Sequence, residues 1–195
     1  MLKKLCKLIF QIIGWKAVDY SQRLSGYNPP VRKFVMIVAP HTSNWDFVIA
    51  LIARYILGYG SNTKFLAKNT LFRFPLKYLL DALGGIPVDR SQKNRLTEQI
   101  ASQFSQAGNE LGIVIAPEGT RKYTPNWKRG FYYIALKANV PILPVAMDYQ
   151  NKLISVHPPF FPTGNVESDI AQLKRFFRKE MARYPDQYAE SPTSN

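Results

Sequence analysis

Two kinds of apolar pattern alternate along the chain. Short runs rich in β-branched residues, such as 33–40 and 111–117, have the length and continuous apolar character of buried strands. Longer stretches, such as 44–58 and 131–139, carry apolar residues at helical spacing, and the first of them ends at Gly58. Because the two kinds of stretch follow one another in turn, we expect an α/β fold with a largely parallel mixed sheet flanked by helices.

The remaining stretches continue this pattern. Further strands are expected at 63–69, 85–90, 141–149 and 152–160, and further helices at 75–85 and from Ser91 to Gly108. A final amphipathic helix is expected from about Ser168 to Met181. No internal repeat or long linker is visible, and 195 residues suit one domain with a substantial core. We therefore predict one domain over 25–187 and a disordered tail over 188–195.

Residues 1–24 begin with an amphipathic pattern. Apolar residues recur there at near-helical spacing with lysines between them: Leu5, Leu8, Ile9, Ile12, Ile13 and Trp15. The uninterrupted apolar stretch is far shorter than the roughly 20 residues needed to span a bilayer. A basic amphipathic helix of this kind can lie in a membrane interface, or it can pack on the domain with a solvated basic face. The pattern leaves both interpretations open.

Composition narrows the choice of partners and of chemistry. The chain carries 26 basic and 13 acidic residues, a net charge of +13, which favours anionic partners such as nucleic acid, phosphorylated metabolites or an acidic lipid surface. With one cysteine, Cys6, the chain can form neither an internal disulfide nor a cysteine metal cluster. Two histidines also argue against a histidine-rich metal site, so we expect no metal.

Candidate chemistry begins at the loop that follows the strand 33–40. Sites in α/β folds form at the carboxyl ends of strands, and His41 and Asp46 stand five positions apart in this loop. A histidine here can act as a general base, with the carboxylate fixing its tautomer and stabilising the imidazolium. The alternative is an ordinary turn in which Asn44 or Asp46 caps the following helix. These two residues alone do not decide between the alternatives.

Two further loops at expected strand ends carry groups suited to an anion. The segment PEGTR at 117–121 offers the planar guanidinium of Arg121, a hydroxyl and backbone N–H groups, although Glu118 and Arg121 could simply pair with each other. Arg90 follows another strand and could reach the same anion, or pair with Asp89. The chain has no G-x-S-x-G elbow, Walker A loop or G-x-G-x-x-G fingerprint. A base with an anion clamp and no evident nucleophile indicates activation of a bound hydroxyl acceptor.

Four ordered blocks give these loops a family resemblance. HTSNWD at 41–46, GGIPVDR at 84–90, PEGTR at 117–121 and VPILPVA at 140–146 resemble the four motifs of the glycerolipid (lysophospholipid) acyltransferase family. The resemblance is closest to the bacterial 1-acyl-sn-glycerol-3-phosphate acyltransferases and extends over roughly residues 35–147. It favours the chemical interpretation of His41 over the capping one.

The resemblance implies transfer of a fatty acyl group from a thioester, acyl-CoA or acyl-carrier protein, to the free hydroxyl of a lysophospholipid. The acceptor it favours is 1-acyl-glycerol-3-phosphate, which would give phosphatidic acid. His41 would be the general base and Asp46 its orienting carboxylate, with no cofactor and no metal. The residues it assigns to the acceptor and its phosphate are Arg90, Glu118, Gly119, Thr120, Arg121 and Lys68.

One segment departs from the family pattern. Family members usually carry an acidic residue shortly after the lysine at Lys68, where this chain has Asn69 and Thr70.

The resemblance also implies a role for the N-terminal helix, because a basic amphipathic anchor would hold the enzyme at the cytoplasmic face of the inner membrane. The resemblance thus implies peripheral or monotopic association with a membrane lipid surface.

Other functions remain as alternatives. The same site could acylate another lysolipid or lipid alcohol, or it could hydrolyse the thioester if water replaced the acceptor. The basic charge and the aromatic residues between Arg121 and Lys137 also fit a nucleic-acid-binding module. No recognised nucleic-acid motif supports that module, so no nucleic-acid partner is expected.

Overall fold

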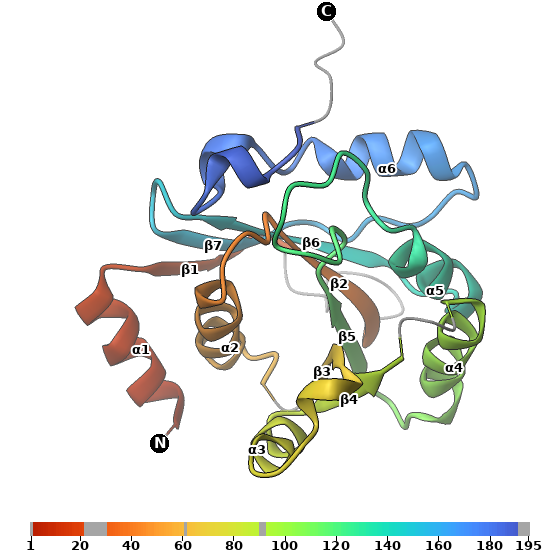
Figure 1. The fold of residues 1–195 in the computed structure, drawn as a ribbon, viewed down its shortest axis with the longest axis horizontal. Helices are drawn as coiled ribbons and strands as arrows, with labels where there is room; N and C mark the ends of the chain where they lie inside the picture. Colours follow the sequence, from red (N-terminus) through yellow and green to blue (C-terminus); the bar gives the residue numbers. More distant parts are fainter. Residues whose placement is uncertain (1, 22–30, 61, 90–92, 191–195) are drawn as a thin grey trace, which may run out of the picture.

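Seven strands in the described part of the chain form one sheet, in the order β1-β7-β6-β2-β5-β3-β4 (Figure 1). The computed structural model describes residues 2–21, 31–60, 62–89 and 93–190. The strands are β1 (Lys16–Asp19), β2 (Lys33–Ala39), β3 (Thr63–Lys68), β4 (Gly85–Val88), β5 (Leu111–Ile115), β6 (Ile142–Asp148) and β7 (Leu153–Val156). The α-helices are α1 (Leu2–Ile13), α2 (Trp45–Leu57), α3 (Leu76–Ala82), α4 (Lys93–Gln106), α5 (Gly130–Ala138) and α6 (Val166–Lys174). Three short 3₁₀ turns are η2 (Asn69–Leu71), η3 (Lys179–Met181) and η4 (Pro185–Gln187).

The sheet is mixed and mostly parallel. Only β6 and β7 pair antiparallel, while every other neighbouring pair runs in the same direction. In the centre, Val35 of β2 lies between Ile113 of β5 and Ile142 of β6. The carboxyl ends of β2, β5 and β6 therefore meet at one edge of the sheet, where a site is expected in such folds. The α/β fold class predicted from the alternating pattern is confirmed.

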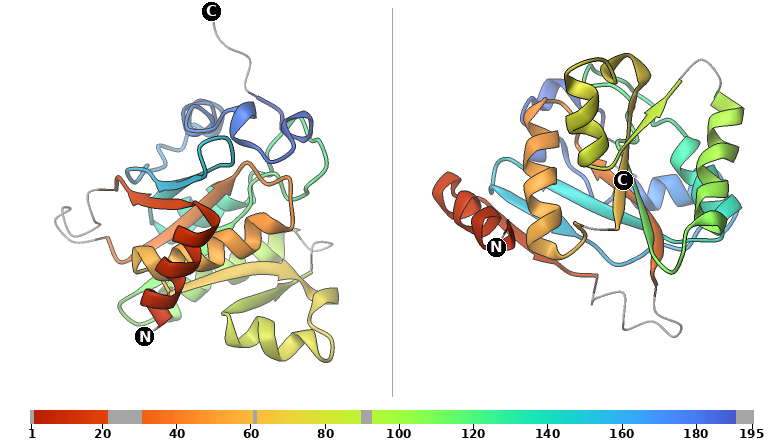
Figure 2. Two further views of the ribbon diagram at one scale, coloured as in Figure 1. Left: turned by 90° about the vertical axis from the view of Figure 1, so that its left-hand side faces the viewer. Right: turned by 90° about the horizontal axis from the view of Figure 1, so that it is seen from below.

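Helices cover both faces of the sheet, and β2 shows why. Its residues alternate in direction, as in any strand. Val35 and Ile37 join a core with α4, α5 and α6, whereas Met36 and Val38 join a second core with α1 and α2. Figure 2 shows α1 and α2 on one side of the sheet, with α4 and α5 on the other. Burial on both faces explains why β2 reads as a continuous apolar run.

The N-terminal helix is present, but it is shorter than the span predicted over 1–24. It ends at Ile13, because Gly14 adopts a left-handed φ of 74° and turns the chain into β1. β1 then pairs in parallel with β7 at the edge of the sheet. The predicted boundary after residue 24 lies outside the described residues.

The surface of α1 combines the two interpretations of its amphipathic pattern. Cys6 and Phe10 are buried, and α1 packs beside α2. The rest of the helix presents both apolar and basic side chains to the surface: Leu2, Leu5, Leu8 and Ile12, with Lys3, Lys4 and Lys7. None of the helices in the described part of the chain has the length and apolar character of a membrane-spanning segment.

The C-terminal segment differs from the single helix predicted up to Met181. α6 ends at Lys174, where hydrogen bonds of the tighter 3₁₀ type follow, such as Phe177 N to Lys174 O at 3.1 Å. This turn lets Phe177 enter the core formed with α4 and α5. Tyr188 is also buried in that core, although it falls in the stretch predicted as a tail. Residues 191–195 lie outside the described part.

Candidate active site

His41 and Asp46 lie together at the carboxyl end of β2. Nδ1 of the imidazole is 3.1 Å from Oδ2 of Asp46, and the His41 side chain remains 24% exposed. Asp46, in the first turn of α2, is only 2% exposed. Because Oδ2 accepts the proton on Nδ1, the second ring nitrogen, Nε2, is left with a lone pair for an incoming hydroxyl. An imidazole held in this way could act as a general base.

The Asp46 carboxylate is held by more than the imidazole. Its Oδ2 also accepts the backbone N–H groups of Thr42 and Ser43, each at 2.8 Å. The carboxylate thus reaches back over the turn that precedes α2, and the Asn44 side chain makes no capping hydrogen bond. The capping alternative is therefore not observed, because Asp46 accepts N–H groups of residues that precede α2 while its carboxylate also contacts the histidine.

Tyr149 completes the shell around Asp46. It follows β6, the strand next to β2, and its hydroxyl donates to Oδ1 of Asp46 at 2.6 Å. Burial raises the pKa of Tyr149 above its usual range, and the hydrogen bond to Asp46 and the charge of Asp46 raise it further. The phenol therefore stays protonated and acts as a donor. Its ring packs edge-on against Trp15, with 5.0 Å between ring centroids.

Glu118 lies on the other side of His41, at the end of β5. Its Oε1 accepts the backbone N–H of His41 at 2.8 Å, and the residue is only 2% exposed. Its Oε2 is buried without a hydrogen-bond partner among the described residues. Burial raises the pKa of Glu118 from 4.5 to about 8, the nearby Asp46 charge raises it too, and the His41 N–H opposes both. The predicted acceptor-binding carboxylate is thus turned toward the histidine loop.

A pH-dependent stability is expected from this group. The pKa of Glu118 is higher in the folded than in the unfolded chain. Its contribution to the free energy of unfolding is therefore fully present below pH 4.5 and is lost as the pH rises through about 8. The expected loss is a few kcal/mol. Glu118→Gln cannot ionise, so its free energy of unfolding should not show this fall.

Urea unfolding at a series of pH values measures the effect as the difference between the wild type and Glu118→Gln. All other titrating groups are common to the two proteins and cancel in that difference. Two pH profiles that run parallel from pH 4.5 to 8 would show that folding does not raise the pKa of Glu118.

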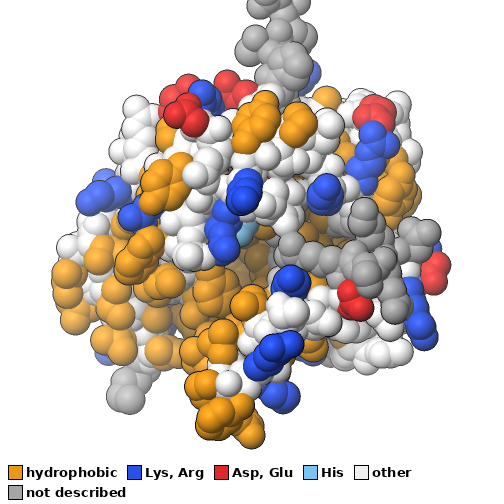
Figure 3. Space-filling model, viewed as in Figure 1, with side chains coloured by type: hydrophobic (Ala, Val, Ile, Leu, Met, Phe, Trp, Pro, Cys, Tyr) orange, Lys and Arg blue, Asp and Glu red, His pale blue; other side chains and the backbone are white. Residues whose placement is uncertain are grey.

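Arg121 and Lys122 line a polar cleft beside the loop 42–45. Arg121 donates to the side-chain oxygen of Asn44, so it reaches from the loop after β5 to the start of α2. The cleft has a volume of about 370 Å³, and the residues around it are Thr42, Ser43, Asn44, Trp45, Arg121, Lys122, Tyr184 and Gln187. Figure 3 shows a hollow on this face with basic side chains along one side. Such a cleft can hold an anion near His41.

The other residues predicted for the phosphate are less tightly grouped. Gly119 forms the turn after Glu118 with a φ of 68°, and the Thr120 hydroxyl accepts the N–H of Lys122 at 3.2 Å. Lys68 is exposed at the end of β3, one strand beyond β5. Arg90, like the predicted helix start at Ser91, lies outside the described residues. Their assignment to the acceptor stays a prediction.

The C-terminal segment supplies groups that the sequence patterns did not single out. The backbone N–H of Tyr184 donates to the Thr42 hydroxyl at 3.2 Å. The guanidinium of Arg183 lies 5.8 Å from the ring centroids of Trp45 and Tyr149. Tyr149 stands at a strand end, which is the signal used for the other loops, but its relevance depends on β6 lying next to β2. Nothing in the sequence pattern indicated Arg183.

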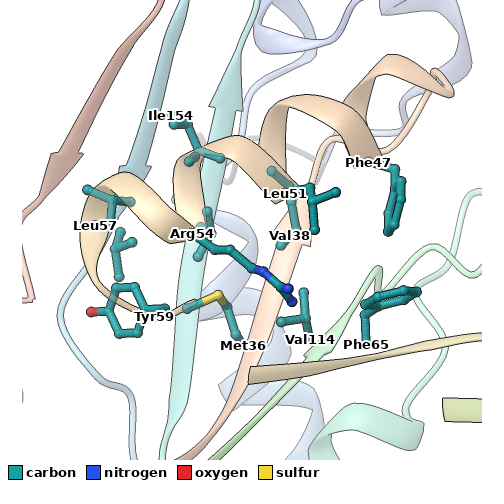
Figure 4. A pocket seen from close by; sticks show the side chains of 14 residues that line it. Met36, Val38, Phe47, Leu51, Arg54, Leu57, Tyr59, Phe65, Val114 and Ile154 are labelled. Atoms are coloured by element: carbon teal, nitrogen blue, oxygen red, sulfur yellow. The ribbon is translucent and has the colours of Figure 1, made fainter. Parts of the chain in front are cut away.

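An apolar pocket lies between α2 and the sheet (Figure 4). Its volume is about 60 Å³, and its lining residues include Met36, Val38, Phe47, Leu51, Leu57 and Phe65. Figure 4 shows the Arg54 side chain crossing it from α2. Since α2 starts beside His41, an apolar chain in this pocket would lie along the helix.

Within the described ranges, no three His, Cys, Asp or Glu side chains cluster as a metal site requires.

Comparison with protein families assigns most of the chain. Residues 23–148 match the family model described as Acyltransferase. An uncharacterized acyltransferase of Schizosaccharomyces pombe is 29% identical over 134 residues, which cover 65% of this chain and 46% of the relative. The human 1-acyl-sn-glycerol-3-phosphate acyltransferase beta is 26% identical over 110 residues, covering 54% of this chain and 39% of the relative. The chain thus spans less than half the length of these curated relatives.

A solved structure resembles the whole fold. The crystal structure of the 1-acyl-sn-glycerophosphate acyltransferase from Thermotoga maritima superposes with a TM-score of 0.58 and 19% identity. The match covers 90% of this chain and 76% of that chain. At this level of identity the likeness is one of fold.

Proposed function

Because the chain belongs to the acyltransferase family, we propose that it is an O-acyltransferase that moves a fatty acyl group from a thioester to a lysophospholipid. The donor is acyl-CoA or acyl-carrier protein, and the acceptor is 1-acyl-glycerol-3-phosphate. The observation that carries the proposal is the hydrogen-bonded pair of His41 and Asp46 beside a basic cleft. Two relatives by sequence and fold are named as acyltransferases acting on this acceptor, which supports the choice.

The reaction follows from the orientation of the imidazole. Nε2 of His41 takes the proton from the acceptor hydroxyl while the oxygen attacks the thioester carbonyl, and a tetrahedral oxyanion forms. Collapse of this intermediate breaks the C–S bond and forms the ester. The leaving thiolate takes the proton back from the imidazolium, so His41 returns to its starting state. Asp46 stabilises the imidazolium between the two steps.

The two pockets suit the two substrates. Arg121 and Lys122 would bind the acceptor phosphate, because a guanidinium and an ammonium form short charge-assisted hydrogen bonds with phosphate oxygens. The apolar pocket along α2 would hold an acyl chain, since its lining offers almost only apolar side chains. Burial of the chain there would also keep water away from the thioester.

The exposed face of α1 supports membrane association. Leu2, Leu5, Leu8 and Ile12 would enter the interface, and the three lysines of the helix would meet anionic headgroups. This places the enzyme on the surface where a lysophospholipid resides. We propose the cytoplasmic face of a bacterial inner membrane, as the family resemblance implies.

The direct test is acyl transfer by the purified protein in detergent micelles. Acyl-CoA and acyl-carrier protein are offered with a panel of lysolipids, and products are identified by mass spectrometry. Phosphatidic acid formed from lysophosphatidic acid is the expected result. Acylation of another lysolipid instead would show that the proposed acceptor is wrong. Free fatty acid released without any acceptor would indicate a thioesterase.

Arg121→Ala should weaken use of the phosphate-bearing acceptor. Loss of a charge-assisted hydrogen bond of about 1.5–3 kcal/mol predicts a rise in KM of roughly tenfold to a hundredfold, with a smaller change in kcat. The reference is monoacylglycerol, which carries no phosphate and should lose much less. Arg121→Lys keeps the charge but not the planar fork, so its KM for the phosphate-bearing acceptor should lie between those of the wild type and Arg121→Ala. Equal losses with both acceptors would contradict a phosphate role.

A further inference from the structure

The segment around α3 leaves an unusual number of large apolar side chains exposed. Phe74 is 85% and Tyr78 68% exposed, although both are aromatic. We call the following exposed residues the α3 patch: Leu71, Phe74, Leu76, Tyr78 and Leu79. In α3 itself only Leu80 is buried. A contiguous exposed apolar cluster on a folded domain marks an interaction site, because water at such a surface is released on binding.

The charges around the α3 patch indicate the kind of partner. Between Thr63 and Val88 the sequence has four basic residues, Lys64, Lys68, Arg73 and Lys77, and one acidic residue, Asp81. Asp81 pairs with Lys77 at 2.6 Å, so three basic side chains remain in excess. A segment that combines apolar and aromatic side chains with an excess of lysine and arginine complements an anionic lipid surface, with the apolar groups in the interface and the charges at the headgroups.

The α3 patch belongs to a wider apolar face. Figure 3 shows hydrophobic side chains gathered over α1, over α2 and over α3 on the side of the molecule that also carries the hollow. On α2 the exposed apolar residues are Trp45, Phe47 and Val48. Trp45 also lines the polar cleft beside His41. A flat surface that touched both α1 and the α3 patch would therefore approach the mouth of the site.

The α3 patch is fixed to the frame that carries the site. Arg54 of α2 donates to the carbonyl oxygen of Leu83, just after α3, at 2.9 Å, and to that of Thr63 in β3 at 3.3 Å. Phe47 of α2 and Phe65 of β3 pack edge-on, with 4.9 Å between centroids. Contact of the patch with a surface would thus orient α2, whose first turn carries Asp46.

From these contacts we propose that the α3 patch is a second membrane-contacting element, which inserts into the interface of an anionic bilayer beside α1. The two contacts hold the enzyme in one orientation, with the mouth of the His41 site on the lipid surface. The proposal rests on the membrane association in the proposed function and adds a residue set and an orientation to it. A lysolipid could then enter the site without crossing water.

Binding to vesicles tests the patch without depending on catalysis. The full chain is sedimented with vesicles of phosphatidylcholine mixed with phosphatidylglycerol, and with vesicles of phosphatidylcholine alone. The variant Phe74→Ser with Leu79→Ser should bind the anionic vesicles roughly tenfold more weakly than the wild type. Leu5→Ser with Leu8→Ser should also weaken binding. Phe161→Ser, at a residue 52% exposed between β7 and α6, is the matched control and should bind as the wild type does.

A fluorescent label reports which face meets the lipid. An environment-sensitive dye is attached at Tyr78→Cys or at Gln172→Cys of α6, each in a Cys6→Ala background. Figure 1 places α6 on the side of the molecule opposite α3. Vesicles should shift the emission to shorter wavelength for the dye at 78 and leave the dye at 172 unchanged.

The outcomes separate this inference from the proposed function. Wild-type vesicle binding by Phe74→Ser with Leu79→Ser, or equal dye shifts at 78 and 172, would overturn the inference. Self-association that this variant abolishes, without any change in vesicle binding, would assign the patch to a second copy and overturn it too. Acyl transfer in detergent micelles should survive in the variant. A wild type that acylates no acceptor in micelles would instead reject the proposed function.

Discussion

His41→Ala is expected to lower kcat for acyl transfer by about a thousandfold. A positioned general base accelerates proton transfer by about 10²–10⁴, and His41 is the histidine whose Nδ1 is held by Asp46 at the end of β2. Without the imidazole, the acceptor hydroxyl would have to lose its proton to water. The measurement is the initial rate of phosphatidic acid formation from acyl-CoA or acyl-carrier protein and lysophosphatidic acid in micelles.

The chain supplies its own control for this experiment. His157, the other histidine, follows β7 and packs on Phe176, with 4.8 Å between ring centroids. His157→Ala should therefore keep the rate within a few-fold of the wild type, and any loss of stability is read from its thermal unfolding. If His41→Ala retained a tenth of the wild-type rate while remaining folded, His41 would not be the base.

Asp46→Asn is expected to reduce kcat by a similar factor, about a thousandfold. The amide matches the carboxylate in shape, but it carries no charge to stabilise the imidazolium and can present N–H instead of an acceptor to Nδ1. Stability should also fall by about 1–3 kcal/mol, because Oδ2 accepts the backbone N–H groups of Thr42 and Ser43 in a buried position. Kinetics and urea unfolding measure the two effects separately.

Tyr149→Phe separates orientation from charge in this prediction. It removes the hydrogen bond to Oδ1 of Asp46 and leaves the carboxylate in place. We expect a loss of roughly tenfold or less in kcat, and a smaller loss of stability than in Asp46→Asn. If Asp46→Asn were as active as Tyr149→Phe, the negative charge beside His41 would not matter to the reaction.

Much of the fold follows from local patterns in the sequence. The continuous apolar run after Lys33 predicts β2, and residues 34–39 are indeed all buried. Gly58 ends α2 because glycine readily takes the left-handed φ of 90° found there. The sequence does not predict where α1 ends, because residues 16–19 carry no strong strand pattern. They form β1 only because β7 offers an edge to pair with. Pairing with an edge strand is a tertiary contact, so the apolar periodicity of residues 16–19 does not predict it.

The candidate site shows the same division. His41 and Asp46 are close in sequence, and one turn of chain is enough to bring them together. Glu118 reaches His41 across 77 positions, and Tyr149 reaches Asp46 across 103. The PEGTR motif predicts that Glu118 serves the acceptor, and the structure adds a contact of its carboxylate with the His41 N–H. The catalytic and binding roles of these residues stay predictions until the variants are measured.

Local apolar patterns predicted the α/β class and most of the helices and strands, and the four motifs between residues 41 and 146 indicated the family and favoured a chemical role for His41 and Asp46. The order of the strands, which places β6 beside β2 and brings Tyr149 to Asp46, is seen only in the folded chain. It also placed the C-terminal segment over the cleft, where Tyr184 bonds to Thr42 across 142 positions, and set the α3 patch on the apolar face with α1. Strand order and helix placement depend on which apolar faces are buried against one another across the whole chain, and no single stretch of sequence contains that information.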